Sequence, residues 1–405
     1  MSNLKKKGTS LRGRRIVWVS SLVLDRTLHK TSRIQILEHL AKRGHEVYLI
    51  AMHSHEKPAL DNTRIHVISF PMRYTPIISP ALYIIALIFF MPLFMLKKKP
   101  DFIITEPQEQ FFALIPSAVL FPMKICKYIL DIRSTPVSSL RNQGVLGYLK
   151  TFTFKVCLQL SKRIFEGVTI ITSLMKKEVC MRFRLDPQKV GVWVDGVSKE
   201  LFTREKYDYD RAKLRSRFGL SDKFVVLYHG VFDRNRGLTE SVESMQFLML
   251  KHPDVIMFLL GSGPFRQHLV ELVKAKQLQG NVIFHDPVRY EDVPRYIAMS
   301  DIGIVPLPNI PDWKNQCPLN LIECLAMEKP VLLTDIPANR EIVGNEDCGI
   351  YVSCDPVSIA ASVDYAYNNR KKLRAWGESG RRIVENKYNW EKAAVAFEDY
   401  LLALE

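Results

Sequence analysis

The chain alternates short strands rich in Val and Ile with helical stretches, and this alternation is the feature that most restricts its fold. Residues 16–21 (IVWVSS) and 45–52 (HEVYLIAM) have the composition of strands, and the helical stretch between them ends at a glycine. The same rhythm continues through IHVISF, FIITEP, KYILDIR, VTIIT and VGVWV. Such a series is typical of a parallel sheet covered on both faces by helices.

A second series of the same kind follows a charged segment that begins at residue 203. Its strands are KFVVLYHG, DVIMFLLGSG, NVIFHD, DIGIVPL, PVLLTD and GIYVS. A chain of 405 residues is too long for one ordinary core. We therefore predict two doubly wound α/β domains, 15–204 and 205–387, behind a basic tail at 1–14. Ligands of such domains bind at the carboxyl ends of the strands, so a cleft between the domains is the expected site.

The positive charge lies entirely in the first half of the chain. Residues 1–200 carry 31 Lys and Arg against 14 Asp and Glu, a balance of +17, whereas residues 201–405 carry 26 against 28. This asymmetry indicates that the first domain faces a polyanionic surface, either an anionic membrane or a nucleic acid. Long aliphatic runs interrupt the basic half and no nucleic-acid motif is recognisable, which favours the membrane.

Residues 77–96 (IISPALYIIALIFFMPLFML) are apolar and precede three lysines. Twenty such residues would just reach across a bilayer. A span would, however, place the first three strands and all later strands on opposite sides of the membrane, and Pro92 would interrupt the helix. A helix buried in the core and a helix lying in or against the membrane surface are the two better interpretations.

The cysteines and the N-terminus indicate a reducing compartment. None of the seven cysteines is paired with another at a metal-ligand spacing, and most stand among apolar neighbours. The basic N-terminus is followed by a strand pattern without a cleavage site, so we expect no signal peptide and a cytoplasmic protein at the membrane face.

Two loops of the second domain have the composition of anion sites. In YHGVFDRNRGL, Arg234 and Arg236 precede a glycine and a helix start, where free amides and guanidinium groups both donate to oxygen anions. A solvated basic loop is the plainer alternative. The turn Gly261-Ser262-Gly263 lies between a strand and a helix but lacks the full dinucleotide spacing, so by itself it is weak evidence.

A third loop, PLNLIECLAMEKPVLLTD, places a carboxylate inside an apolar run. Pro318 suits the first turn of a helix, which leaves the amides of Leu319 and Asn320 free to face an anion. Glu323 follows one turn later, and its two oxygens match the vicinal hydroxyls of a ribose. A phosphate at the helix start and a ribose on the next turn together describe a nucleoside diphosphate.

The second half, over residues 224–401, resembles the nucleotide-sugar domain of glycosyltransferase family 4. The matching segments are YHGVFDRNRGL, LLGSGP, VIFHDPVRYEDVPRYIAMSDIGIVPLP, PLNLIECLAMEKPVLLTD, NREIV and YNWEKAAVAFEDYL. Weaker matches continue in the first half through LAKRGHEVYLI, KPDFIIT, ITSLMKKEV and VWVDGVSKELF. The resemblance implies the GT-B fold, retention of anomeric configuration, no required metal or cofactor, and a last helix, about 388–405, that returns to the first domain.

The resemblance also assigns roles to residues of the second domain. Glu323 matches the glutamate that binds the donor ribose, and Arg236 matches the basic residue that holds the diphosphate. The remaining donor-side candidates are strand ends, turn glycines, the segment lining the base and the start of the third loop: His229, Gly230, Arg234, Gly261, Gly263, Val288, Pro318, Leu319 and Asn320. His285 also ends a strand, and a histidine satisfied by packing is the alternative for both histidines.

The sequence departs from the family pattern at three places. Asn315 stands where the family has a glutamate near the donor sugar, which removes a charge that could stabilise an oxocarbenium-like transition state. Val231 replaces a basic residue after Gly230, for which Arg234 could substitute. The glycine pair common in the first strand–helix loop is missing from SSLVLDRTLHKTS.

In the first domain, DIRSTP matches the segment where relatives place a cleft histidine or an Asp-Arg-Asp run. Asp131 and Arg133 are therefore the acceptor-side and catalytic candidates, with a structural Asp–Arg pair as the alternative. Trp193 and Trp390 are expected to pack. The function we expect is transfer of a hexosyl group from a nucleoside diphosphate sugar to a lipid-linked or membrane-bound glycan. The alternatives are an inactive GT-B nucleotide-binding or regulatory protein and a nucleic-acid-binding protein.

Overall fold

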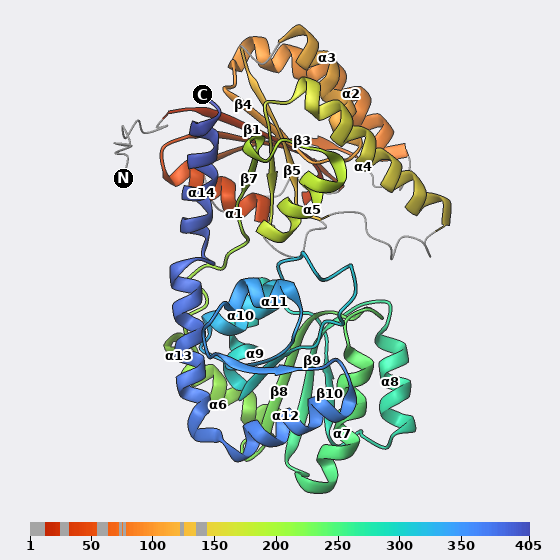
Figure 1. Cartoon of the computed structure of the whole chain (residues 1–405), viewed down its shortest axis with the longest axis vertical. Coiled ribbons are helices and arrows are strands. Elements are labelled where there is room, and N and C mark those ends of the chain that lie inside the picture. Colours follow the sequence, from red (N-terminus) through yellow and green to blue (C-terminus); the bar gives the residue numbers. More distant parts are fainter. Residues whose placement is uncertain are drawn as a thin grey trace. The chain divides into compact units, whose positions relative to one another are not determined.

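The computed structural model describes residues 13–24, 32–54, 64–72, 75, 78–121, 125–134 and 144–405. Most of the predicted basic tail, residues 1–12, and the first strand–helix loop lie outside this part. The chain divides into two compact units (Figure 1). Unit 1 comprises residues 1–193 and 394–405, and unit 2 comprises residues 194–393.

Unit 1 is built on a seven-stranded parallel sheet in the order β3-β2-β1-β4-β5-β6-β7. Its strands are β1 (Arg15–Val23), β2 (Glu46–His53), β3 (Ile65–Pro71), β4 (Phe102–Thr105), β5 (Lys127–Ile132), β6 (Gly167–Ile170) and β7 (Val190–Val192). Its helices are α1 (Ser32–Lys42), α2 (Ile78–Lys98), α3 (Glu109–Leu120), α4 (Gly144–Ile164) and α5 (Ser173–Phe183). The central strands are almost wholly buried, as their continuous Val and Ile content requires.

Unit 2 is built on a six-stranded parallel sheet in the order β10-β9-β8-β11-β12-β13. Its strands are β8 (Phe224–Val231), β9 (Val255–Ser262), β10 (Val282–His285), β11 (Ile302–Val305), β12 (Val331–Thr334) and β13 (Gly349–Val352). Its helices are α6 (Asp208–Arg217), α7 (Leu238–Lys251), α8 (Arg266–Ala275), α9 (Val293–Met299), α10 (Leu319–Ala326), α11 (Pro337–Val343), α12 (Pro356–Asn368) and α13 (Arg370–Asn386). Every strand predicted from the alternation is present in the two sheets.

Both sheets reverse their strand order at one point, and these points locate the candidate site. In unit 1 the order turns between β1 and β4, and in unit 2 between β8 and β11. Open parallel sheets bind ligands outside the carboxyl ends of the strands at such a reversal, because the loops there diverge to opposite faces. Residues at the carboxyl ends of β1, β4, β8 and β11 are therefore the candidates for contact with a ligand.

The last helix, α14 (Trp390–Ala403), begins in unit 2 and continues in unit 1 from Ala394 onward. Phe397 packs against the rings of Trp18 and Trp193 at centroid distances of 6.2 and 5.4 Å. Glu398 forms an ion pair with Arg43, and its Oε1 lies 3.3 Å from Nε2 of the buried His45. The expected return of the last helix to the first domain is confirmed by these contacts.

The boundary between the units differs from the predicted one by about ten residues. The structure divides after Trp193 instead of near residue 204, and residues 194–204 belong to unit 2. Val197 forms a parallel bridge with Asn389, and Arg381 Nη1 donates to the carbonyl of Phe202 at 2.6 Å. These contacts attach the segment to unit 2 before the charged segment begins.

The helix α2 is neither wholly buried nor wholly exposed. By length and composition it is the one helix of the described part that could cross a membrane, and one third of its apolar window is buried. Tyr83 Oη donates to the carbonyl oxygens of Ser20 (2.9 Å) and Ile50 (3.2 Å), which attaches α2 to β1 and β2. The interpretation as a fully buried core helix is therefore wrong, because the opposite side of α2 is exposed.

Candidate functional site

The carboxylate of Glu323 lies in the second turn of α10, directly beside the end of β8. Its Oε2 is 2.7 Å from Nε2 of His229, and both side chains are nearly buried. Burial alone lowers the pKa of His229, but hydrogen bonding to Cys324 and to the Glu323 carboxylate more than offsets this and raises the pKa to about 10. His229 is therefore protonated at neutral pH and donates to Glu323 in a buried ion pair.

The first turn of α10 lies at the same place. Pro318 is the N-cap residue rather than the first helical residue, and Leu319 and Asn320 follow it. Asn320 Nδ2 lies 3.5 Å from the carbonyl oxygen of His229, and Asn320 Oδ1 accepts the amide of Leu321. The predicted members of the third loop are thus gathered at the end of β8, where the positive end of the helix dipole favours an anion.

The glycines at the ends of β8 and β9 allow two backbones to approach closely. Gly261 has φ +146°, and a Cβ atom there would lie 1.9 Å from the carbonyl oxygen of Gly230. A Cβ atom at Gly263 would lie 2.2 Å from the carbonyl oxygen of Phe232. Backbone packing is thus sufficient reason for both glycines, and their contact with a nucleotide stays a prediction.

The basic loop after β8 is held to a loop of the opposite half of the sheet. The guanidinium of Arg236 stacks on the ring of Trp313 with its central carbon 4.3 Å from the ring centroid. Trp313 Nε1 donates to the carbonyl oxygen of Asn235 at 2.6 Å. Arg236 Nε is buried without a hydrogen-bond partner within the described part of the chain, whereas Arg234 is exposed. The stacked Arg236 is the better placed of the two for a buried phosphate.

The other two predicted residues of unit 2 lie on loops near these groups. Asn315 is half-buried, two residues beyond Trp313. Val288 is half-buried in the loop that leads to Tyr290. Burial and then the charge of Glu323 raise the pKa of Tyr290 well above its usual value, which places this loop beside α10. By contrast, His285 stacks on Phe258 with ring centroids 5.9 Å apart, so it is a packing residue.

In unit 1, Asp131 is fully buried at the end of β5 and takes part in an internal network. Its Oδ1 accepts hydrogen bonds from Thr169 Oγ1 (2.7 Å) and Trp193 Nε1 (3.0 Å). Arg133 Nε lies 4.0 Å from Oδ2, and its guanidinium stacks on Trp193 at 3.6 Å. This geometry matches the structural Asp–Arg pair. Trp193 and Trp390 are both buried, as expected of packing residues.

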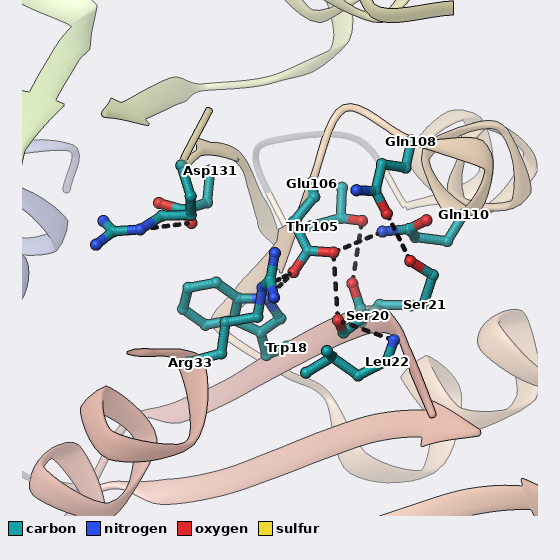
Figure 2. Close-up of polar contacts among 12 residues, drawn as sticks. Trp18, Ser20, Ser21, Leu22, Arg33, Thr105, Glu106, Gln108, Gln110 and Asp131 are labelled. Carbon is teal, nitrogen blue, oxygen red and sulfur yellow. Dashed lines mark hydrogen bonds and ion pairs between the residues drawn. The ribbon is translucent and has the colours of Figure 1, made fainter. Parts of the chain in front are cut away.

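A second buried carboxylate, Glu106, lies at the reversal point of the unit 1 sheet and was not anticipated from the sequence. It follows β4 and occupies the centre of Figure 2, where it forms an ion pair with Arg33. Its Oε1 accepts from Trp18 Nε1 at 2.9 Å, and its Oε2 accepts from Ser20 Oγ (3.2 Å) and Gln110 Nε2 (2.8 Å). Burial raises the pKa of Glu106, against the opposing charge of Arg33.

This network, which we call the Glu106 cluster (Trp18, Ser20, Arg33, Glu106 and Gln110), joins the ends of β1 and β4 to α1 and α3. The sequence does contain a pattern that could have indicated this cluster. In FIITEP, Glu106 comes directly after a strand of apolar residues, much as Asp131 does in KYILDIR. Its oxygens are already engaged by four side chains. The cluster is therefore suited to fixing β1 and β4 to the helices α1 and α3, not to binding a ligand itself.

Comparisons with known proteins show which proteins this chain is similar to. Residues 210–383 match the model of the family described as glycosyl transferases group 1. A putative glycosyltransferase, YtcC of Bacillus subtilis, is 23% identical over 254 residues, covering 59% of this chain and 61% of that protein. The capsular polysaccharide biosynthesis glycosyltransferase CapM of Staphylococcus aureus is 23% identical over 378 residues, covering 90% of this chain and 93% of CapM.

The whole fold has counterparts among solved structures. HepE of Anabaena, solved in complex with UDP, superposes with a TM-score of 0.72 at 15% identity, covering 96% of this chain and 99% of HepE. At such identity the likeness establishes the fold alone. Apart from CapM, the matches to the first curated relatives span about half to three-fifths of the length of those proteins.

Proposed function

This chain belongs to the glycosyltransferases of the GT-B fold, and we propose that it transfers a hexosyl group from a nucleoside diphosphate sugar to a lipid-linked or membrane-bound glycan. We place it in glycosyltransferase family 4, with retention of anomeric configuration. CapM acts in capsular polysaccharide biosynthesis and HepE is a structure with UDP, which supports a role in glycan biosynthesis with a nucleotide donor.

The observation that carries this proposal is the position of Glu323. Its carboxylate lies one turn inside α10, at the reversal point of the unit 2 sheet, and a protonated histidine holds one of its oxygens. The other oxygen makes no hydrogen bond with the residues that the structure describes. It is the acceptor that we assign to a ribose hydroxyl, with the diphosphate at the start of the helix.

The remaining groups of unit 2 would serve the leaving diphosphate. In the reaction the bond between the anomeric carbon and the phosphate oxygen breaks, a bond to the acceptor hydroxyl oxygen forms, and the hydroxyl proton leaves with the nucleoside diphosphate. Arg236, with Arg234 and the first amides of α10, would meet the developing phosphate charge in place of a metal ion. Val288 would line the base, and Gly261 and Gly263 would let the nucleotide approach the backbone.

On the acceptor side we propose that Arg133 contacts the glycan, with Asp131 positioning it through the buried network of Trp193. We also propose that the protein associates peripherally with the cytoplasmic face of an anionic membrane, where a lipid-linked acceptor would be presented. The balance of +17 over residues 1–200 supports this location.

The assignment of Glu323 is tested by titrating UDP and GDP into the protein and into Glu323→Ala. We expect the variant to lose about 2–4 kcal/mol of binding free energy for the preferred nucleotide, the scale of a lost charge-assisted hydrogen bond. Glu271→Ala, an exposed carboxylate on α8, is the matched control and should bind as the parent does. Unchanged affinity in a folded Glu323→Ala protein would overturn the assignment.

The assignment of Arg236 is tested by comparing a nucleoside diphosphate with the bare nucleoside. We expect Arg236→Ala to weaken binding of the diphosphate and to leave nucleoside binding nearly unchanged, because only the former presents the anion. Equal losses for both ligands would mean that Arg236 supports its loop through Trp313.

The alternative of an inactive nucleotide-binding protein rests on Asn315, which stands where the family has a glutamate. Incubation with UDP- and GDP-sugars and a lipid-linked acceptor distinguishes an active transferase from an inactive nucleotide-binding protein. Product of retained anomeric configuration, observed by NMR, supports the transferase. Nucleotide binding without transfer or donor hydrolysis would support the alternative.

A further inference from the structure

The helix α2 presents two apolar sides, and only one of them belongs to the core. Tyr83, Leu87 and Met91 are fully buried against the sheet, and Tyr128 Oη contacts the sulfur of Met95 at 3.5 Å. This inner side keeps α2 within the layer that covers the unit 1 sheet. It follows that α2 cannot leave the domain to cross a bilayer without dismantling that packing.

The outer side of α2 carries large apolar side chains at helical spacing. Phe89 is 72% exposed and Leu93 is 68% exposed. Together with four others they lie three or four residues apart, so they share one side of the helix: Ile78, Leu82, Ile85, Phe89, Leu93 and Leu96. The described part of this side carries no charge until Lys97.

The exposed apolar surface continues onto two neighbouring helices. The helix α3 packs against both α2 and α4, so the three form one layer (Figure 1). Exposed apolar residues near the end of α3 and on the first turns of α4 extend the surface: Val119, Leu120, Ile125, Val145, Tyr148, Leu149 and Phe152. We call these side chains, together with the outer side of α2, the three-helix face. Patches of such extent on soluble proteins mark contacts with a partner or a membrane.

The charges around the three-helix face favour a lipid surface. Residues 78–164 contain eleven Lys and Arg against four Asp and Glu, and neither α2 nor α4 contains an acidic residue. Of the four carboxylates, Glu106 and Asp131 are buried. The exposed cations beside the face are Lys97, Lys99, Lys150, Lys155, Lys162 and Arg163. An apolar centre with these exposed cations around it matches acyl chains below anionic headgroups.

From this arrangement we propose that the three-helix face inserts into one leaflet of an anionic membrane, with its lysines and arginines at the headgroups. The inference deepens the proposed function, on whose membrane-bound acceptor it rests. A second copy of the chain is a poorer occupant, because pairing the face with itself brings two basic rims together. Insertion requires no opening of the fold, since every residue of the face is exposed already.

Vesicle co-sedimentation of the full-length protein tests the proposal with three variants. Phe89→Glu/Leu93→Glu should lower partitioning onto vesicles containing phosphatidylglycerol at least tenfold at low and high salt, because it places charge in the acyl region. Lys97→Glu/Lys99→Glu should lower partitioning at low salt and matter much less at high salt, because the charge contribution is screened. The matched control is Leu250→Glu on α7, where the side chain is 87% exposed outside the face.

Depth of insertion is read from a fluorescent substitution. The fluorescence of the tryptophan introduced by Phe89→Trp should shift to the blue when vesicles are added, and brominated lipids should quench it. The tryptophan introduced by Leu250→Trp should show neither the shift nor the quenching. If both tryptophans respond alike, or if Phe89→Glu/Leu93→Glu binds vesicles as the control does, the proposal is wrong. Loss of a dimer in that variant, with no vesicle binding by the parent, would assign the face to a second copy instead.

Failure of this inference is distinguishable from failure of the proposed function. Nucleotide titration of the Phe89→Glu/Leu93→Glu protein reports on unit 2 without any lipid, and we expect it to be unchanged. A protein that inserts through the face but binds no nucleotide would overturn the proposed function alone. One that binds nucleotide but does not insert would overturn only the inference.

Discussion

At the scale of single residues, two buried carboxylates differ in how many of their oxygens are engaged by neighbouring side chains. Glu323 is paired with one histidine and keeps an oxygen for a ligand, whereas Glu106 accepts from Trp18, Ser20 and Gln110 and pairs with Arg33. A carboxylate whose oxygens are all engaged is suited to holding structure, and one with an oxygen to spare is suited to binding. This contrast is the reason for assigning the donor to Glu323.

The protonation of His229 makes the stability of the protein depend on pH in a defined direction. Its pKa of about 10 in the folded chain lies above the value of about 6.5 in an unfolded chain. The stabilisation is therefore complete below pH 6.5 and is lost as the pH rises toward 10, at up to about 1.4 kcal/mol for each pH unit. His229→Gln, which can still donate to Glu323, should lack this loss.

Urea unfolding of the parent and of His229→Gln at pH 6, 8 and 9.5 measures this difference. The gap in unfolding free energy should narrow as the pH rises. Lys329 acts in the opposite direction in both proteins, because burial lowers its pKa to about 7, and so it cancels in the comparison. A gap that stays constant across this range would show that the pKa of His229 is not raised in the folded protein.

Replacing Glu106 should destabilise unit 1 without affecting nucleotide binding. In Glu106→Gln the amide group cannot accept from all the donors that now surround the carboxylate, and Arg33 loses its counter-charge. We expect a loss of about 3 kcal/mol in unfolding free energy. Glu178→Gln is the control, because this half-buried residue of α5 forms an i,i+4 surface ion pair with Arg182, and the change should alter stability by less than about 0.5 kcal/mol. Similar stabilities for both variants would remove the structural role assigned to the Glu106 cluster.

At the scale of elements, α14 is the helix on which the closure of unit 1 depends. Phe397 fills the space between Trp18 and Trp193, and Glu398 pairs with Arg43. The ring of Tyr400 covers Gly167 and Gly191, where a Cβ atom would lie 2.0 Å and 2.3 Å from Tyr400 atoms. These two strand positions can only be glycine while that ring is present.

Truncating Phe397 tests the contribution of α14 to unit 1. Phe397→Ala should lower the unfolding free energy by about 3–5 kcal/mol, the usual cost of emptying a buried aromatic site. Denaturant unfolding followed by tryptophan fluorescence is a direct measurement, because Trp18 and Trp193 line the cavity. Tyr365→Ala, on the half-exposed surface of α12, is the control. A cost below about 1 kcal/mol would show that α14 is not needed for the core of unit 1.

At the scale of the whole molecule, the two units have separate cores and separate candidate roles. The unit 2 core is formed around β8, β9 and β11 by the helices on one face of its sheet. Unit 1 has its own sheet, its three-helix face and the Glu106 cluster. A ligand that binds one unit should therefore stabilise that unit first.

Calorimetric unfolding with and without nucleotide tests this separation. If the donor binds to unit 2 as proposed, a saturating nucleoside diphosphate at a hundred times its Kd should stabilise the transition of unit 2 by about 2.7 kcal/mol and move the transition of unit 1 much less. Phe397→Ala should lower the unit 1 transition and leave the nucleotide-induced shift in place. A single transition that shifts as a whole in both proteins would mean that the units unfold together.

The order of the strands along the chain, the glycine turns and the loops that carry Arg236 and Glu323 could all be predicted from the sequence, because each is a local pattern of neighbouring residues. Glu323 and His229, which pair with each other, are 94 positions apart in the sequence. The Glu106 cluster likewise joins three segments that are distant in the sequence. Such contacts depend on the strand order and the register of the sheet, and the local periodicity of a sequence predicts neither. Which side of α2 is exposed could not be predicted either, because a helix that is apolar all round contains no pattern that distinguishes its core side from its surface side.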